Sequence, residues 1–253
     1  MNTFHSRHAG CRVRYHDLPG HGEPLVLIHG LGCASSYEYP RIVADPAFGG
    51  RRAILVDLPG SGYSERPRHY AYTTRDQAQV VVELLGALGF AQYWLYGHSM
   101  GGSIAIEVAA RAPHLLHGLV VSEPNFHPGG GEFSRAIAAH DEARFTDEAY
   151  YRLLEQESAF WAGSLMNNAP FAVWRAAASL VQGAEVDWYA AFLAFAKPKQ
   201  LIFGEASLPD ADFASLAAAG VSTAVIPSAG HAMSCENPTA LADALRRFCE
   251  TAA

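Results

Sequence analysis

Short apolar runs, each ending in a polar or glycine-rich turn, alternate with stretches of helical spacing along most of this chain. That alternation restricts the fold more than any other feature. A short, unbroken apolar run is typical of a strand buried on both faces of a sheet. The runs are Pro24–Ile28, Arg52–Val56, Tyr93–Tyr96, Leu119–Ser122, Gln200–Phe203 and Ala224–Ile226. Strands alternating with helices predict a doubly wound, mostly parallel α/β sheet with helices on both faces.

Residues 126–189 break this rhythm. They contain helical segments, such as Asp147–Trp161 and Pro170–Val181, but no convincing strand pattern. A total of 253 residues is a common length for a single α/β fold. We therefore predict an α/β core formed by residues 1–125 and 190–253, with a helical cap, residues 126–189, inserted between two strands. The segment up to Asp17 is predicted to form an edge hairpin.

Composition and charge exclude several classes of protein. Acidic residues outnumber basic ones by 25 to 18, and the chain has only two lysines, so we expect no nucleic-acid or anionic-membrane partner. No apolar run approaches the roughly 18 residues of a membrane helix. The polar N-terminus lacks the apolar core of a signal peptide, and the four cysteines form no CxxC pair, which predicts reduced thiols and a cytoplasmic location. The twelve histidines include no HxxxH or HExxH pair, so we expect no metal site.

The strongest chemical motif is Gly97-x-Ser99-x-Gly101, which follows one predicted strand and precedes a predicted helix. In this context the serine occupies a strained turn that lifts its hydroxyl away from the backbone. The flanking glycines are needed because the turn brings backbone atoms too close for a Cβ. The amides at the start of the following helix suit a developing oxyanion. We predict that Ser99 is a nucleophile.

Four motifs together give the chain a resemblance to the α/β-hydrolase superfamily, which extends over nearly all of it except the inserted cap. They occur in the superfamily's order: His29-Gly30, then Asp57-Leu-Pro-Gly60-Ser-Gly62-Tyr-Ser64, then Gly97-His-Ser-Met-Gly101, then Gly230-His231 followed by Glu236-Asn-Pro238. The resemblance implies a triad of serine, acid and histidine, an oxyanion hole and a cap over the pocket. It gives Asp57 and Ser64 a structural role.

A serine nucleophile needs a base, and His231 is the candidate because it follows a predicted strand late in the chain, as the superfamily's order requires. The acid is less clear. Ser207 stands where the superfamily most often has an aspartate. Glu123, at the end of the strand beside that of Ser99, occupies the acid position of some branches, haloalkane dehalogenases among them. We favour Glu123, with Asp210, a potential helix cap, as the alternative acid.

The remaining site residues are those of the oxyanion hole, which follow from the resemblance, and those of the pocket roof, which follow from the composition of the cap. The oxyanion hole is predicted to use the backbone N–H groups of Leu31 and Met100. The cap is rich in large apolar side chains, some of which should line the pocket roof. Trp161, Trp174 and Phe126 are our candidates for substrate binding.

These features predict a cofactor-free serine hydrolase acting on a carboxylic ester or related acyl compound, with a small, uncharged, moderately apolar substrate. A serine rather than an aspartate nucleophile argues against dehalogenase or epoxide hydrolase chemistry. The alternatives are a C–C bond hydrolase or an aminopeptidase with the same triad, and a non-catalytic small-molecule receptor built on this fold. The sequence predicts no particular oligomeric state.

Overall fold

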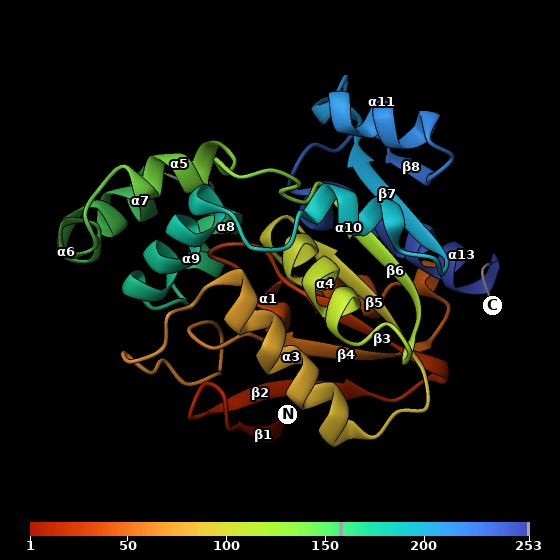
Figure 1. Ribbon diagram of the computed structural model, residues 1–253, viewed down its shortest axis with the longest axis horizontal. Coiled ribbons are helices and arrows are strands. Elements are labelled where there is room, and N and C mark those ends of the chain that lie inside the picture. Colours follow the sequence, from red (N-terminus) through yellow and green to blue (C-terminus); the bar gives the residue numbers. More distant parts are fainter. Residues whose placement is uncertain (157–158, 252–253) are drawn as a thin grey trace.

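The computed structural model describes residues 1–156 and 159–251. Its centre is an eight-stranded sheet with the strand order β1-β2-β4-β3-β5-β6-β7-β8 (Figure 1). The strands are β1 (Asn2–Ser6), β2 (Cys11–Leu18), β3 (His21–Ile28), β4 (Arg51–Asp57), β5 (Tyr93–His98), β6 (Leu116–Ser122), β7 (Lys199–Gly204) and β8 (Ser222–Ile226). Strands β1 and β2 form an antiparallel hairpin, and β2 is also antiparallel to β4. The remaining pairs in this order, from β4 to β8, are parallel. The predicted α/β fold and its edge hairpin are therefore confirmed.

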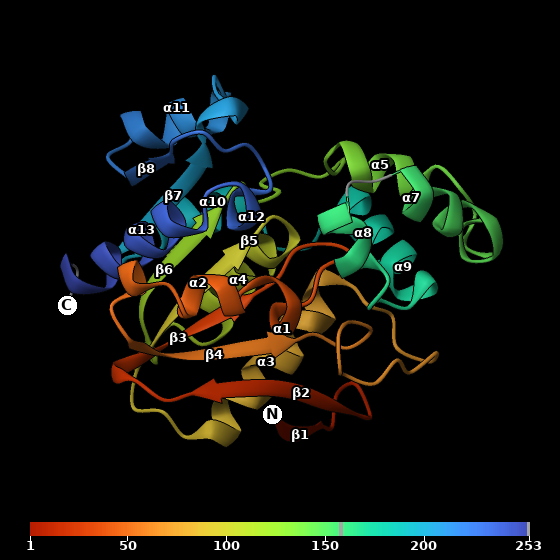
Figure 2. The same cartoon turned by 180° about the vertical axis from the view of Figure 1, so that it is seen from behind.

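Helices cover both faces of the sheet (Figures 1 and 2). One face carries α3 (Thr74–Leu88), α4 (Met100–Arg111), α10 (Trp188–Ala194) and α11 (Ala211–Ala218). The other carries α1 (Ser35–Glu38), α2 (Pro40–Val43), the short helix η1 (Pro46–Phe48), α12 (Met233–Glu236) and α13 (Pro238–Thr251). Successive residues of a strand point to opposite faces. Accordingly, Val26 and Ile28 of β3 pack in the core with α3 and α4, whereas Leu25 and Leu27 pack in the core with α2 and α13.

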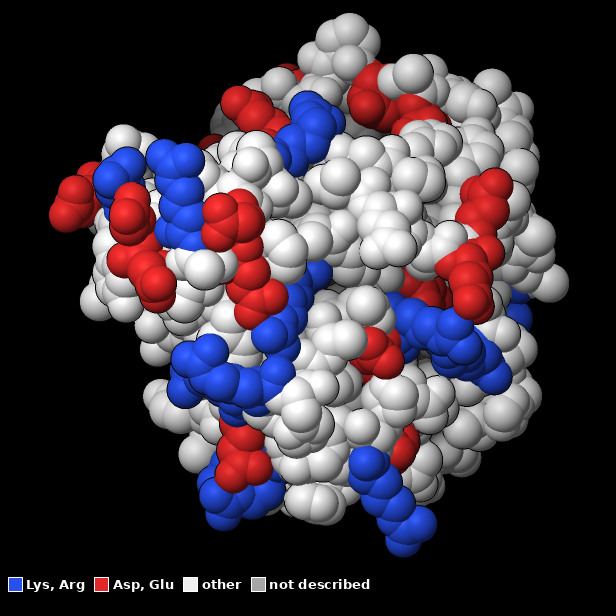
Figure 3. All heavy atoms as spheres, turned by 60° about the vertical axis from the view of Figure 1, so that its left-hand side comes forward, with Lys and Arg blue, Asp and Glu red and all other residues white. Residues whose placement is uncertain are grey.

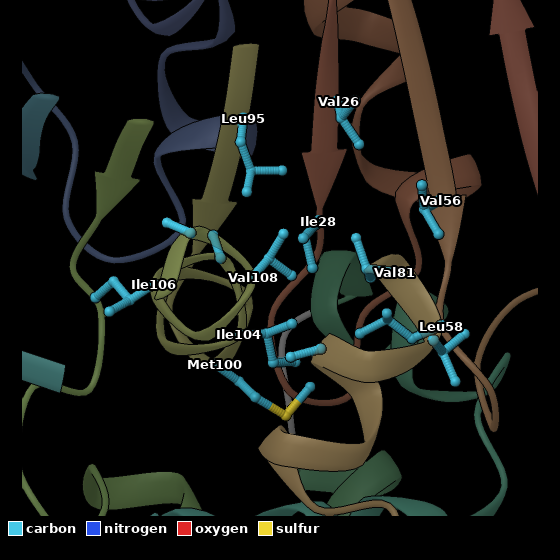
Figure 4. Close-up of a cluster of buried hydrophobic side chains, with 14 of the residues drawn as sticks. Val26, Ile28, Val56, Leu58, Val81, Leu95, Met100, Ile104, Ile106 and Val108 are labelled. Carbon is cyan, nitrogen blue, oxygen red and sulfur yellow. The ribbon is translucent and has the colours of Figure 1, made fainter. Parts of the chain in front are cut away.

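Figure 4 shows the first of these cores. Ile104 and Val108 of α4 and Val81 of α3 lie among the valine and isoleucine side chains of β3 and β4, and all are fully buried. This packing fixes the start of α4 against the carboxyl ends of the central strands, where open α/β sheets bind their ligands.

A helical region is inserted between β6 and β7. It contains α5 (Glu132–Ala138), α6 (Glu142–Arg144), a turn of π-helix η2 (Phe145–Ala149), α7 (Tyr150–Gln156), α8 (Ala159–Leu165), α9 (Pro170–Gln182) and then α10. Helices α5 to α9 lie to one side of the sheet and share a small core of their own, which includes Phe145, Tyr150 and Val173. Helix α10 instead packs on the sheet side, since Trp188 and Phe192 belong to the core that holds α4. The exact limits of the cap, residues 126–189, stay a prediction.

Of the two helical segments predicted in the insertion, one matches a single helix and the other does not. Pro170–Val181 matches α9 almost residue for residue. Asp147–Trp161, predicted as one helical segment, is divided among the π-helical turn, α7 and α8, with residues 157–158 outside the described part of the chain. Among the described residues, no helix combines the length and apolar character that crossing a membrane requires.

Candidate active site

Ser99 lies in the sharp turn between β5 and α4, with backbone angles of φ 53° and ψ −123°. Positive φ is uncommon for a residue with a side chain and marks local strain. The turn depends on its glycines. A Cβ on Gly97 would lie 2.1 Å from the carbonyl oxygen of Gly101, and a Cβ on Gly101 would lie 2.4 Å from that of Ile28. Close backbone contact thus explains both glycines of the motif.

We expect Gly101→Ala to destabilise the protein by about 1–3 kcal/mol, because the new methyl group must displace the backbone of β3. The matched control is Gly86→Ala within α3, where a Cβ meets nothing within 4 Å. That variant should gain up to about 1 kcal/mol of stability from helix propensity. Urea unfolding of both variants measures the difference. Equal stabilities would contradict the packing argument for the turn.

Glu123 follows β6 directly and points its carboxylate at His231. The distance from Glu123 Oε2 to His231 Nδ1 is 2.6 Å, and Glu123 Oε1 accepts a hydrogen bond from the N–H of Gly204 at 2.9 Å. Glu123 also has a positive φ of 40°. Its side chain is 8% exposed and that of His231 is 49% exposed, so the carboxylate is shielded while the imidazole faces open space. The predicted acid and base are therefore in direct contact.

The ionisation of Glu123 determines the tautomer of His231. Burial raises the pKa of Glu123, but the hydrogen bonds and charge interaction with His231 and the bonds from Gly204 and Ser207 outweigh it, and the net pKa is lowered. An ionised carboxylate only accepts hydrogen bonds, so His231 must carry its proton on Nδ1. Among the described residues, the ring makes no other hydrogen bond, which leaves Nε2 as an acceptor.

The other two candidates for the acid position have different roles. The side chain of Ser207, in the position where the superfamily most often has aspartate, makes a hydrogen bond with Glu123. Asp210 lies at the N-terminus of α11, where its carboxylate accepts a hydrogen bond from the N–H of Phe213 at 2.8 Å. Asp210 is thus a helix cap. The contact with His231 is made by Glu123.

The loop after β3 is held by His29. The N–H of Leu58 donates to His29 Nε2 at 3.2 Å, so the neutral ring carries its proton on Nδ1 and donates to the carbonyl of Gly30 at 2.9 Å. Burial lowers the pKa of this fully buried histidine, which keeps it neutral. Within the described part of the chain, the backbone N–H groups of Leu31 and Met100 donate no hydrogen bond. Both remain available to an oxyanion.

A cavity of about 540 Å³ lies between these elements and the helical insertion, and both Ser99 and His231 line it. Of the three predicted substrate-binding residues, Trp161 lines the cavity. Trp174 and Phe126 are not part of the described wall. Trp174 donates from Nε1 to the carbonyl of His140 at 2.8 Å, and Phe126 packs in the core against Phe192. Their apolar character serves packing.

Some wall residues were missed by sequence reasoning, namely Glu38, Asn125, Phe133, Phe160 and Phe203. Phe133 and Phe160 belong to the large apolar residues of the insertion, and the sequence does not indicate which of these line the cavity. The ring of Phe133 lies 4.9 Å from that of Trp161. Glu38 ends a four-residue helix, which is too short to show a helical spacing of apolar residues in the sequence.

A serine–histidine contact is also present between Ser122 and His98, at the ends of the neighbouring strands β6 and β5. Ser122 Oγ is 2.9 Å from His98 Nδ1, a distance that suits a nucleophile–base pair, and 2.8 Å from the hydroxyl of Tyr96. However, Ser122 is fully buried. Burial and the neighbouring His231 lower the pKa of His98 to about 3, so this histidine is neutral at physiological pH. Among the described residues, no group of three or more histidine, cysteine or acidic side chains is arranged to hold a metal ion.

A serine in a strand–turn–helix elbow at the carboxyl edge of a mostly parallel sheet, beside a histidine–carboxylate pair, defines the class of α/β hydrolases. The family model described as "alpha/beta hydrolase fold" matches residues 23–238. The chain belongs to this family.

Curated relatives match only part of this chain. It is 39% identical over 114 residues to 2-hydroxymuconate semialdehyde hydrolase of Pseudomonas sp. (strain CF600), a match covering 45% of this chain and 40% of the relative. The chain thus spans less than half the length of this relative.

Solved structures are similar over nearly the whole chain. The enol-lactonase from Burkholderia xenovorans LB400 has a TM-score of 0.81 at 19% identity, covering 98% of this chain and 100% of that one. An esterase from Thermogutta terrifontis has a TM-score of 0.79 at 22% identity, covering 96% and 94%. At these identities the likeness shows the fold.

Proposed function

We propose that the protein is a serine hydrolase that cleaves a carboxylic ester or a related acyl compound through an acyl-enzyme. Ser99 is the nucleophile, His231 the general base and Glu123 the acid that orients the base. The observation that carries the proposal is the 2.6 Å contact between Glu123 and His231 on the wall of a cavity that Ser99 also lines. The proposed steps need only side chains and backbone amides of this chain, without a cofactor.

In the first half of the reaction, Nε2 of His231 accepts the Ser99 proton as Oγ attacks the substrate carbonyl carbon. The carbonyl oxygen becomes an oxyanion, which the N–H groups of Leu31 and Met100 stabilise. The imidazolium is stabilised by the Glu123 carboxylate. Collapse of the tetrahedral intermediate breaks the bond to the leaving alcohol, which takes the proton from His231.

In the second half, water enters and His231 accepts one of its protons. The resulting hydroxide adds to the acyl carbon, and the second tetrahedral intermediate expels Ser99 Oγ, which recovers its proton from His231. The products are one carboxylic acid and one alcohol. A half-exposed His231 fits this step because solvent reaches the base directly.

The substrate is proposed to be a small molecule. A cavity of about 540 Å³ falls within the usual size of small-molecule sites. The wall combines aromatic side chains, among them Phe133, Phe160 and Trp161, with polar side chains. The face that carries the insertion shows acidic and basic side chains interspersed around a broad uncharged area (Figure 3). These features favour an apolar acyl or alcohol group.

Hydrolysis of a C–C bond is the second candidate. It is favoured by the 39% identity to a 2-hydroxymuconate semialdehyde hydrolase over part of the chain. The same nucleophile and base would serve a ketone substrate, with a carbon leaving group in place of the alcohol. Assays with 2-hydroxymuconate semialdehyde and with simple esters distinguish C–C bond hydrolysis from ester hydrolysis. Aminopeptidase activity would appear as cleavage of an aminoacyl amide.

We expect a fluorophosphonate probe to label the protein at Ser99, because an activated serine attacks phosphorus and displaces fluoride. Peptide mass mapping identifies the labelled residue. Ser99→Ala is the control and should remain unlabelled. Labelling at Ser122 instead would show that the nucleophile is Ser122, paired with the buried His98. Absence of labelling in the folded wild-type protein would favour a non-catalytic receptor and contradict the proposal.

A further inference from the structure

His98, the residue before the proposed nucleophile, lies on the cavity wall beside the proposed base. The centroids of the His98 and His231 rings are 4.6 Å apart. His98 lines the cavity although the residue is only 6% exposed. Its ring also approaches the loop after β3, since a Cβ on Gly30 would lie 3.4 Å from His98 Cδ2 and 3.4 Å from Ser99 Cβ. The imidazole of His98 is therefore held close to the place where the substrate reacts.

A buried chain of hydroxyl groups determines which nitrogen of this ring carries the proton. Ser122 Oγ lies 2.8 Å from the hydroxyl of Tyr96 and 2.9 Å from His98 Nδ1, and both Tyr96 and Ser122 are fully buried. In the described part of the chain, Ser122 Oγ is the one acceptor for the Tyr96 hydroxyl, so Tyr96 donates to Ser122. The proton of Ser122 then has His98 Nδ1 as its acceptor.

A ring that accepts at Nδ1 and is neutral must carry its proton on Nε2. Burial and the neighbouring His231 lower the pKa of His98 to about 3, so the ring is neutral near pH 7. Among the described residues, His98 Nε2 has no hydrogen-bond partner. Other unpartnered nitrogens are fully enclosed, such as His117 Nδ1, but His98 Nε2 is not one of these. Because His98 lines the cavity, its N–H group is open to a ligand there.

The proposed role of His231 indicates which part of an ester meets this donor. His231 gives its proton to the leaving oxygen, so the alcohol portion of the substrate must lie beside the imidazole of His231. The ring of His98 is in contact with the same imidazole. The N–H donor of His98 should therefore face the alcohol portion, close to the ester bond.

We propose that His98 is a specificity-determining residue that selects esters whose alcohol portion carries a hydrogen-bond acceptor, such as an ether oxygen, near the ester bond. This inference rests on the proposed function and narrows it. An alkyl chain at this place would leave the N–H of His98 without a partner once the substrate displaces water, whereas an ether oxygen accepts its hydrogen bond. The expected gain in kcat/KM is about three- to tenfold, the scale of one hydrogen bond between neutral groups.

The test uses two esters of the same length. 2-Methoxyethyl butanoate and butyl butanoate differ by one oxygen in place of a methylene group in the alcohol portion, and the quantity measured is the ratio of their kcat/KM values. In His98→Asn, the side-chain amide can replace Nδ1 and keep the bond with Ser122, but nothing replaces the N–H at Nε2. We expect this variant to lower the ratio by about three- to tenfold.

His98→Gln is the matched control, because its longer side chain can bring an amide N–H to the position of Nε2. The ratio for this variant should stay within about twofold of the wild-type value. Effects on His231 that are common to both esters cancel in the ratio, as does the intrinsic reactivity of the esters. Butyl methoxyacetate supplies the same oxygen on the acyl side and should show no such dependence on His98.

Each outcome has a distinct meaning. An unchanged ratio in His98→Asn overturns the selection and leaves the serine hydrolase intact, and an equal fall in His98→Gln overturns the role of the N–H donor. Dependence on His98 for the methoxyacetate alone overturns the assignment to the alcohol portion. No hydrolysis of any ester, together with no labelling of Ser99, overturns the proposed function and the selection with it. If the variants do not fold, ¹⁵N NMR of the wild-type protein decides, since a proton on Nδ1 of His98 overturns the proposal.

Discussion

Replacing Ser99 by alanine is expected to lower kcat for ester hydrolysis by a factor on the order of 10⁶ while the protein remains folded. The substitution removes only the hydroxyl. The backbone N–H of Ser99 continues to donate to the carbonyl of Ser122, a bond of 2.9 Å that ties the turn to β6. Single-turnover and steady-state rates with an activated ester, compared with circular dichroism and thermal unfolding, measure the two effects separately.

His231→Ala provides the matching test, since the nucleophile and the base act as one unit. Its loss should be similar in size, and the double variant should be no slower than either single variant. Ser122→Ala serves as the control for the buried pair and should retain most activity, although it leaves His98 and Tyr96 without their shared partner. Substantial hydrolysis by folded Ser99→Ala protein would exclude Ser99 as the nucleophile.

Glu123→Gln is expected to reduce kcat by roughly 10⁴-fold with little change in the fold. A glutamine amide nitrogen can donate to Nδ1 of His231, which favours the tautomer with the proton on Nε2. That tautomer cannot accept the Ser99 proton, and the positive charge of the imidazolium loses its carboxylate. The measurement is the ratio of kcat in the variant and the wild type, with labelling by the fluorophosphonate as a second readout of serine activation.

Asp210→Asn is the matched control, because it removes the competing carboxylate on the same cavity wall. Asparagine also caps helices, so even a complete loss of the cap would cost only about 1 kcal/mol, and activity should stay near the wild-type level. The acid assignment fails if Asp210→Asn loses orders of magnitude in rate or if Glu123→Gln keeps a near-normal one. Neither result would alter the fold.

The central sheet could be predicted because short apolar runs such as Pro24–Ile28 and Tyr93–Tyr96 end in turn residues and alternate with stretches of helical spacing. The turn around Ser99 could be predicted because its glycines stand where backbone atoms of the motif and of the neighbouring strand leave no room for a Cβ. The pairing of Glu123 with His231 was predicted from the resemblance to branches of the superfamily that carry the acid at the end of the strand beside that of the nucleophile. Adjacent parallel strands bring their carboxyl ends together whatever lies between them in the sequence.

The wall of the cavity could not be predicted in the same way. Trp161 and Trp174 have similar apolar surroundings in the sequence, yet one lines the cavity and the other packs within the insertion. Which partner an amphipathic helix covers depends on the angles between helices, and residue spacing does not encode those angles. Glu38 carries no sequence signal because its burial depends on contacts with Ser234, which lies far away in the chain.

The proposed nucleophile and acid, Ser99 and Glu123, end neighbouring strands and are tied together by main-chain bonds, and both precede the helical insertion. The insertion therefore interrupts the chain after these two groups are in place and before the strand and loop that deliver His231. Helices α5 to α8 carry none of these three groups, whereas α9 is also anchored in the main core through Phe171 and Leu180. We therefore expect that exchanging the segment between β6 and α9 disturbs the three groups less than exchanging α9 itself, which makes that segment the part of the insertion to vary for new acyl specificities.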